Sequence, residues 1–503
     1  MNIPCRKSLQ LVWPLLIVIS GCGSCGNGAD TALPDDTTEP WEMPLFADLR
    51  HADARVGGEL DGGELGTVVA PAGSVLGDGR MALLLTEHGL SDSFPAMAHV
   101  VPGDLRGEVS IDAAVATIST EHWSDEFKAA SARMGDANGD GVDDLLLGVP
   151  NRYHKDQGNY EGVATILSGP LTGAHSVAEA SVVLASETAD GKAGSTVNFV
   201  GDLNGDAFDD ITISDPSFSG DFGQAGAVYV LYGPLTASGD LSLADYRLEG
   251  ESNGAGATGG VGIGDANGDG YSDFMVKTDG ERLHIFHGPV TESATLTSAV
   301  AQIDMDTRAV ESAAGDVDGD GADDILVGTP DLCYHCDDYD DRRPFSGAAY
   351  VYSGRLEGSH TRQDATVSIV DRVDYSYFGN TAVAVGDVNG DGLADIMVGE
   401  AADCGYYDYL PCQGYASLFL GPLMGSLIRY TDGDIHFLGE AKGDWAGVAV
   451  AGLGDLDGDG LSDLAIGAPL ADIRAEDSGA AYIVLGREDI VGYYQALQDA
   501  EDQ

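Results

Sequence analysis

The sequence has few basic residues and no long apolar segment beyond its N-terminus. Of 503 residues, 24 are Lys or Arg and 83 are Asp or Glu, which gives a formal net charge of −59. Proteins bind nucleic acid through clustered Lys and Arg, so this balance predicts no nucleic-acid partner. After Ile19 no apolar run reaches the about 20 residues that span a bilayer. We therefore expect the rest of the chain to lie outside the cytoplasmic membrane.

Sequence signatures of common enzyme classes are missing as well. The chain has no GxSxG, HExxH or P-loop motif, and its 11 histidines are scattered, with His154, His335 and His436 the three to inspect. Residues 254–259 match GxGxxG, but this segment precedes a predicted strand instead of a helix. We expect no enzyme. The abundant paired carboxylates leave a carbohydrate-active enzyme as an alternative.

Glycine, in contrast, is abundant. The 71 glycines are about twice the average share of a protein. Hydrophobic residues make up 43% of the chain, which is too many for a disordered acidic segment. The composition indicates a folded protein that is rich in turns.

The N-terminus has the features of an export signal. A short basic region at Arg6 and Lys7 precedes the apolar run Leu11–Ile19, and small residues lead to Cys22. Ile19-Ser-Gly-Cys22 resembles a lipoprotein signal-peptidase site, which implies a signal peptide over residues 1–21 and a lipid on Cys22. Residues 22–44 are small, polar and acidic, so they are predicted to form a flexible tether. An ordinary cleaved signal is the alternative.

One motif occurs six times, with oxygen-bearing side chains at positions 1, 3, 5 and 9 and a turn residue at position 6. A backbone carbonyl at position 7 completes a set of oxygen ligands that can wrap a calcium ion. The predicted metal ligands are Asp136, Asn138, Asp140, Val142 and Asp144; Asp202, Asn204, Asp206, Phe208 and Asp210; Asp265, Asn267, Asp269, Tyr271 and Asp273; Asp316, Asp318, Asp320, Ala322 and Asp324; Asp387, Asn389, Asp391, Leu393 and Asp395; and Asp455, Asp457, Asp459, Leu461 and Asp463.

These loops are not EF-hands. An EF-hand needs a bidentate Glu at position 12 and a helix on each side, whereas position 12 is apolar in all six loops. Short β-rich runs flank each loop, as in Val383–Val385 and Ile396–Val398. Each metal loop is therefore predicted to be the turn of a β-hairpin.

Two further short strands follow each hairpin, so that about 60 residues hold four strands. Repeats of this kind are typical of a β-propeller. A degenerate unit with Gly77-Asp78-Gly79 precedes the six others, and its turn is too short to supply ligands. We predict an all-β, seven-bladed propeller of four-stranded blades over residues 45–486, with calcium in six blades and a C-terminal tail at 487–503.

The repeated motif GDxNGDGxxDxxxG, with Phe378-Gly379 before the fifth metal loop and Gly467-Ala468-Pro469 after the last, resembles the FG-GAP repeat of the integrin α-subunit propeller and of related bacterial surface proteins. The resemblance implies the propeller fold, about six calcium ions and the ligand positions given above. The chain departs from the pattern at Ala207, which replaces the position-6 glycine of the second loop and makes its geometry doubtful.

The last unit contains three clear strands, so another segment must close the ring. We expect Leu45–Leu49 to supply the missing strand. The alternative is that Ile490–Tyr494 returns as this strand.

Two loops between second and third strands, residues 331–343 and 402–412, are rich in Tyr and Asp and contain two cysteines each. Outside the cytoplasm such pairs indicate disulfides, Cys333 with Cys336 and Cys404 with Cys412. A zinc site or a redox CxxC is the alternative. Tyr-rich loops suit ligand contact, although stabilised surface insertions are as good an interpretation.

These features predict a calcium-binding propeller in the cell envelope, with the outer membrane favoured by Gly23 after Cys22. Its expected role is binding or adhesion to an extracellular protein or glycan, and its membrane contact is through the lipid anchor only. A structural component of an envelope assembly is a further alternative.

Overall fold

The computed structural model describes residues 45–501, apart from 92–93, 123–124, 126, 128, 131–133, 155–158, 189, 221, 253, 255, 279–281, 291–294, 306, 333–345, 372, 374–375 and 401–412. The predicted signal, lipidation site and tether lie outside these residues, and so do all seven cysteines. The domain boundaries, the disulfides and the zinc alternative therefore stay predictions.

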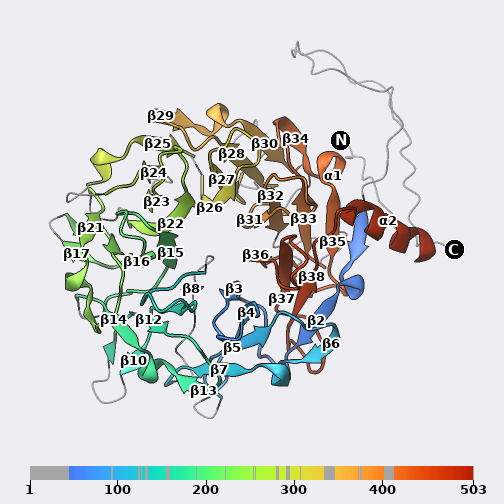
Figure 1. Cartoon of the computed structure of the whole chain (residues 1–503), viewed down its shortest axis with the longest axis horizontal. Helices are drawn as coiled ribbons and strands as arrows, with labels where there is room; N and C mark the ends of the chain where they lie inside the picture. The colour runs from blue at the N-terminus through green and yellow to red at the C-terminus, as the bar shows by residue number, and fades with distance from the viewer. Residues whose placement is uncertain are drawn as a thin grey trace, which may run out of the picture.

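The described strands form a ring of seven sheets around a central axis, as Figure 1 shows. The first strand of each sheet is innermost, and the second, third and fourth strands follow outward in antiparallel order. This is a seven-bladed β-propeller, and the fold class predicted from the sequence is confirmed.

The first and second strands of each blade frame the hairpins predicted from the sequence. From blade 1 to blade 7 the first strands are β3 (Val69–Gly73), β8 (Ala129–Ala130), β15 (Val197–Gly201), β22 (Thr258–Gly264), β26 (Val310–Gly315), β31 (Thr381–Gly386) and β36 (Ala449–Gly454). The second strands are β4 (Ala82–Glu87), β9 (Leu145–Val149), β16 (Asp210–Asp215), β23 (Asp273–Thr278), β27 (Asp324–Thr329), β32 (Asp395–Glu400) and β37 (Asp463–Ala468).

The outer half of each blade consists of two more strands. The third strands are β5 (Met97–Pro102), β12 (Val163–Leu167), β19 (Ala227–Leu231), β24 (Arg282–Phe286), β28 (Ala348–Tyr352), β33 (Tyr415–Phe419) and β38 (Ala480–Val484). The fourth strands are β7 (Ala116–Ser119), β14 (Val182–Ala185), β21 (Tyr246–Glu249), β25 (Ala301–Asp304), β30 (Val367–Val370), β35 (Ile435–Leu438) and, for blade 7, β2 (Ala54–Gly57).

Most second and third strands are buried on both faces, which explains their continuous apolar runs. The core is divided accordingly. Seven apolar clusters each fill the space between two neighbouring blades, and one of them joins blade 7 to blade 1 through Val56, Leu83 and Ile483. Each blade thus buries its apolar surface against its two neighbours.

A fifth strand joins six of the seven sheets and ties neighbouring blades together. It comes from the connection between the third and fourth strands of the next blade and pairs in parallel with the fourth strand of its host. We call these segments straps. They are β6 (Gly107–Ser110), β13 (Gly173–Ser176), β20 (Gly239–Asp240), β29 (Gly358–Thr361), β34 (Gly425–Ile428) and β1 (Phe46–Asp48).

A single helical turn precedes the fourth strand of each blade. These turns are η1 (Leu49–His51), η2 (Ile111–Ala113), η3 (Val177–Glu179), η4 (Leu241–Leu243), η5 (Leu296–Ser298), η6 (Arg362–Asp364) and α1 (Arg429–Asp432). Two small hairpins extend from the connections between second and third strands, β10 (Tyr153–His154) with β11 (Asn159–Tyr160) and β17 (Ser219–Gly220) with β18 (Gly223–Gln224).

The N-terminal segment closes the ring, but not through the predicted residues. Residues 54–57 form the fourth strand of blade 7 and pair antiparallel with β38. Leu45–Leu49 instead contributes β1, the strap on blade 6, which pairs in parallel with β35. The segment β1–η1–β2 is therefore a full copy of the strap, turn and fourth strand found in the other blades, and it is supplied to blade 7 from the opposite end of the chain.

The alternative closure through residues 490–494 is wrong, because this segment belongs to the helix α2 (Ile490–Glu501). α2 packs on the outside of blades 6 and 7 near β1, as Figure 1 shows. Its buried Tyr494 contacts Phe437 with ring centroids 5.3 Å apart. Arg487, just before the helix, forms an ion pair with Asp53 just before β2. The two ends of the propeller are thus joined.

Two truncations from the N-terminus test the strap β1 and the closing strand β2 separately. We expect a chain that begins at Asp53 to lose the strap on blade 6 and to melt at a lower temperature than a chain that begins at Leu45. A chain that begins at Gly58 also loses β2, and with it the antiparallel pairing to β38 and the buried Ala54 and Val56. We expect it to lose cooperative melting. Equal melting curves for all three chains would contradict this account of closure.

Candidate metal centre

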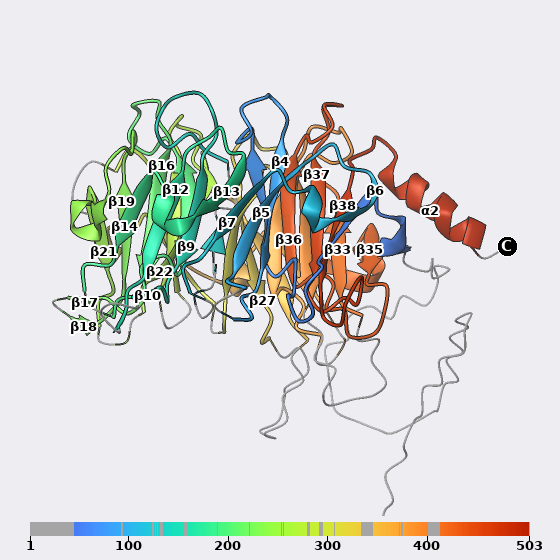
Figure 2. The same cartoon turned by 90° about the horizontal axis from the view of Figure 1, so that it is seen from below.

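All six predicted metal loops connect a first strand to a second strand, so they lie on one face of the propeller. In Figure 2 this is the upper face, and the hairpins β10–β11 and β17–β18 lie on the lower one. A register shift precedes the loop in blades 3 to 7 and ends at a glycine with positive φ, for example Gly315 at 70° and Gly386 at 78°. Such a bulge bends the chain where the strand passes into the loop.

The carboxylate at position 1 organises each loop. In blade 2, the amides of Gly139 and Gly141 donate to Asp136 at 2.7 and 2.6 Å. The same pair of contacts recurs in the other five loops at 2.6–2.9 Å. Because these amides fix both oxygens of the side chain, the loop holds its shape and directs the other oxygen atoms toward one another.

The carboxylate at position 9 lies at the base of each loop and is buried. In all six loops its Oδ2 accepts a hydrogen bond from the amide of position 2 at 2.7–3.2 Å. In five loops Oδ1 accepts from a glycine amide that follows the third strand, at 2.8–2.9 Å. In blade 5, Oδ1 of Asp324 is buried without a hydrogen-bond partner among the described residues.

Burial raises the pKa of every position-9 carboxyl, and the carboxylates at positions 1, 3 or 5 raise it further. The pKa rises to about 6 for Asp144 and Asp463 and to about 7 for Asp210, Asp273, Asp324 and Asp395. These carboxyls resist ionisation until a positive charge offsets their neighbours.

In two loops, part of the predicted ligand set lies together. Positions 1, 3 and 9 lie within 4.8 Å of one another in the two loops with Asp at position 3, as Asp316, Asp318 and Asp324 and as Asp455, Asp457 and Asp463. The other four loops have Asn at position 3. Clustered carboxylate and amide oxygens suit a hard cation, and the unpartnered oxygen of Asp324 adds a buried acceptor that a cation could satisfy. The residues present therefore fit a divalent metal.

Ala207 does not distort the second loop. Its φ is 71°, close to the values of the glycines at the same position, and its amide donates to Asp202 at 2.8 Å. The loop therefore keeps the shape of the others, at the cost of a strained alanine.

The shortened turn of blade 1 holds an arginine where the other blades hold the metal loop. Arg80 contacts Asp78 at 2.8 Å and Asp104 at 3.2 Å. The hydrogen bonds from Arg80 lower the pKa of Asp78. The guanidinium thus pairs with one carboxylate of the short turn and with one of the connection that follows the third strand.

Neighbouring loops also contact one another. The residue at position 8 of one loop hydrogen-bonds to the position-1 residue of the preceding blade, as when the Asp136 amide donates to Asp209 and the Asp265 amide donates to Asp323, both at 3.0 Å. Backbone bonds make the same link between blades 5 and 6 and between blades 6 and 7. The sequence motif assigns no role to position 8, and this contact was not predicted.

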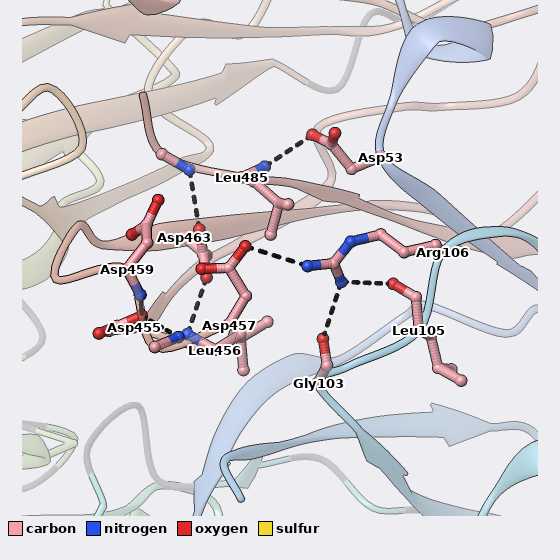
Figure 3. Close-up of polar contacts among 12 residues, drawn as sticks. Asp53, Gly103, Leu105, Arg106, Asp455, Leu456, Asp457, Asp459, Asp463 and Leu485 are labelled. Atoms are coloured by element: carbon pink, nitrogen blue, oxygen red, sulfur yellow. Dashed lines mark hydrogen bonds and ion pairs between the residues drawn. The ribbon is translucent and has the colours of Figure 1, made fainter. Parts of the chain in front are cut away.

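Two further arginines reach the loops and were also not predicted. Arg106 of blade 1 contacts Asp457 of blade 7 at 3.0 Å, as Figure 3 shows, and Arg355 contacts Asp320 at 3.2 Å. The first pair is 351 residues apart in the sequence, so no local pattern could reveal it.

The three histidines singled out in the sequence form no described catalytic group. His335 and the side chain of His154 lie outside the described residues. His436 is fully buried beside Ser417 and Arg429, and burial lowers its pKa to about 3. Arg429 in turn pairs with Asp371 at 2.8 Å and with Glu400. This buried network joins blades 5 and 6.

Among the helices that the structure describes, none has the length and apolar character needed to cross a membrane.

Comparisons with known proteins agree with the repeat and the fold. The FG-GAP repeat family matches residues 379–406 and 446–484. Integrin alpha pat-2 of Caenorhabditis elegans is 30% identical over 200 residues, which is 37% of this chain and 14% of that protein. Integrin alpha-PS2 of Drosophila melanogaster is 32% identical over 187 residues, which is 34% of this chain and 13% of that protein.

This chain thus spans about a seventh of the length of these curated relatives. Among solved structures, BBS1N in complex with ARL6DN aligns with 90% of this chain and 98% of its own, at 9% identity and a TM-score of 0.46. The FG-GAP repeats and the integrin α-like propeller predicted from the sequence are confirmed.

Exchanges at position 6 test the strain at Ala207. We expect Ala207→Gly to stabilise the protein by about 1 kcal/mol, because glycine adopts a positive φ without a steric penalty. The reciprocal Gly141→Ala, where no atom lies within 4 Å of the added Cβ, should lose about as much. Urea unfolding of both variants checks this. A destabilised Ala207→Gly variant would contradict it.

The position-9 carboxyls predict how the stability of the metal-free protein depends on pH. Their folded pKa values lie above those of the unfolded chain, so the fold binds more protons and its stability falls as pH rises from about 4 to about 7. Buried histidines such as His436 act in the opposite direction below about pH 6.5, but they are fewer. Asp395→Asn should flatten the decline, measured by urea midpoints of metal-stripped protein. An unchanged slope would contradict the assignment.

Proposed function

We propose that this protein is an exported, lipid-tethered, calcium-binding propeller that acts as a binding or adhesion module for an extracellular protein or glycan. The similarity to integrin α chains supports a binding role at the cell surface. Because the matches cover a minor part of those proteins, the ligand has to be argued from this chain.

The observation that carries the proposal is a set of exposed large side chains on one face. They lie on connections between second and third strands or between a fourth strand and the next blade, which puts them opposite the metal loops (Figure 2). With 40–51% of their surface exposed, they are Leu90, Phe94, Tyr160, Phe222 and Trp445. We call them the aromatic face. Exposed aromatic residues in loops on a rigid scaffold are typical of binding sites.

Trp445 supports a role for this face in binding. This residue is 40% exposed. Its positive φ of 57° recurs at Glu64 and Tyr377, which precede the corresponding bridge in other blades, so the backbone conformation belongs to the repeat. A large apolar side chain that stays exposed contributes little to the core, and exposed apolar patches often mark interaction sites.

Calcium has a structural role in this proposal. Every loop carries three carboxylates, at positions 1, 5 and 9, and in blades 5 and 7 those at positions 1, 3 and 9 lie within 4.8 Å of one another, so the loops hold negative charges that repel one another without a cation. Calcium binding would offset this repulsion and fix both ends of the hairpin, so its binding free energy adds to folding stability. About six ions are expected, each held by side chains at positions 1, 3, 5 and 9 and the carbonyl at position 7.

A carbohydrate-active enzyme and a structural envelope component remain the alternatives, and the aromatic face favours binding over both. Product release from an acidic polysaccharide would favour the first of them. A stoichiometric envelope complex that is insensitive to substitutions on the aromatic face would favour the second.

Calcium titration of the metal-stripped full chain tests the metal part of the proposal. We expect about six ions to bind and the melting temperature to rise, because at free calcium 100-fold above Kd each ion adds about 2.7 kcal/mol. Asp395→Asn should reduce the number of bound ions by one. Binding of fewer than about three ions, or a stability that ignores calcium, would contradict the proposal.

Substitutions on the aromatic face test the binding part. Calcium-loaded protein is applied to a glycan array and to a panel of extracellular proteins, and the ligands found are tested again with Phe94→Ala, Phe222→Ala and Trp445→Ala. We expect each substitution to weaken binding at least tenfold, as truncation of a central aromatic contact does. Leu243→Ala and Met424→Ala, which are 60% and 71% exposed in connections between third and fourth strands, are the controls. Equal binding by both sets of variants would contradict a binding role for the aromatic face.

A further inference from the structure

The six metal loops differ in charge at position 3. Four loops have Asn there, so three carboxylates occupy their ligand positions. The loops of blades 5 and 7 have Asp318 and Asp457 instead, which gives them four. The extra carboxylate raises the repulsion within the loop and should also raise its attraction for a cation.

In the same two loops an arginine forms an ion pair with a carboxylate at a ligand position. Among the ion pairs between described residues, Arg355 meets Asp320 in blade 5 and Arg106 meets Asp457 in blade 7, and no other Arg or Lys pairs with a carboxylate at a ligand position. One guanidinium against four carboxylates leaves three negative charges. All six loops therefore have the same balance at their ligand positions.

Arg106 is held in place for this contact. Its Nη1 donates to the carbonyl oxygens of Leu105 at 2.7 Å and Gly103 at 3.4 Å, which directs Nη2 to Oδ2 of Asp457 (Figure 3). The connection itself fits closely against the loop, since a Cβ on Gly103 would lie 2.6 Å from Leu456. Asp457 is 23% exposed and Arg106 43%, so the pair is accessible to ions from solution.

We propose that Arg106 and Arg355 are built-in cations that balance the fourth carboxylate of the blade-7 and blade-5 loops and lower the calcium affinity of these loops to that of the other four. In blade 7 the contact also crosses the seam between the last and first blades, so Arg106 of blade 1 offsets one of the four carboxylate charges of that loop. This inference rests on the calcium binding proposed above and adds the residues that set the affinity of two sites.

The proposal predicts opposite effects for the two partners of one ion pair. Arg106→Gln leaves four uncompensated carboxylates, and the blade-7 loop should bind calcium about three- to tenfold more tightly, as expected for the loss of one positive charge near a divalent ion in water and salt. Asp457→Asn should weaken binding by a similar factor. The double variant restores three negative charges and should return close to the wild-type affinity.

Hydrogen exchange measured by mass spectrometry resolves one loop among six. The full chain is titrated with calcium, and the free concentration that gives half-maximal protection is read for the peptide spanning residues 455–463. The peptide spanning 387–395 in blade 6 is the internal reference. Arg106→Lys keeps the charge and should leave the midpoint unchanged. Arg282→Gln removes an arginine that pairs with Asp304 on the face opposite the metal loops, and it should also leave the midpoint unchanged. Raising the salt concentration should shrink the effect of Arg106→Gln.

The outcomes separate this inference from the metal proposal on which it rests. If wild-type loops gain no protection with calcium, both fail. If the wild-type loops do gain protection with calcium, calcium binding stands. The charge-balance role of Arg106 is then overturned if Arg106→Gln leaves the free calcium concentration at half-maximal protection of residues 455–463 unchanged or raises it. A shift of all loops together would also overturn it, because it would mean that Arg106 acts through the stability of the seam. In blade 5 Arg355 pairs with Asp320 and not with the extra carboxylate Asp318, so Arg355→Gln combined with Asp318→Asn tests the charge count there without a direct contact between the two residues.

Discussion

The structure depends on burial between neighbouring blades, because the propeller has no common centre in which apolar residues could gather. Seven separate clusters fill the seven interfaces, so each blade is stable only while both neighbours are present. This makes the seam between blade 7 and blade 1 as necessary as any other interface. The chain meets that need by supplying β1, η1 and β2 from its N-terminal side, and Arg487 then pairs with Asp53 across the join. Closure is thus a repeat unit divided between two ends of the chain.

The metal loops are compatible with this packing because their negative charge is kept at one edge of the blades. Backbone amides hold the position-1 carboxylates, while the buried position-9 carboxyls have raised pKa values and resist ionisation. Three arginines offset part of the remaining negative charge. Arg80 does so in the blade without a metal loop, and Arg355 and Arg106 do so at the two loops with a fourth carboxylate. The six metal loops therefore carry the same net number of negative charges at their ligand positions.

The sequence predicted the features that are set by local spacing and missed those set by contacts across the ring. The motif around Asp316 or Asp387 specifies its own turn within nine residues, so the six hairpins and the blade count could be read directly. The closing strand Ala54–Gly57 has only four residues and little pattern, so the more apolar Leu45–Leu49 was preferred. The pairing of Arg106 with Asp457 depends on the ring bringing together segments 351 residues apart. The parallel pairing of the straps could not be predicted from the sequence for the same reason.

The two faces of the propeller are separated by the length of a strand, and this constrains how calcium and a ligand could influence one another. In blades 3 to 7 the second strand begins at a position-9 carboxylate and ends at a connection on the opposite face, as β32 does from Asp395 to Glu400. Six residues of strand span about 20 Å, so a bound ion does not touch a ligand on the aromatic face. Any dependence of ligand binding on calcium must then pass through the stability of the blades. In that case removal of calcium would weaken binding only under conditions where it also loosens the fold, and the inter-blade clusters, which both faces share, would transmit the effect.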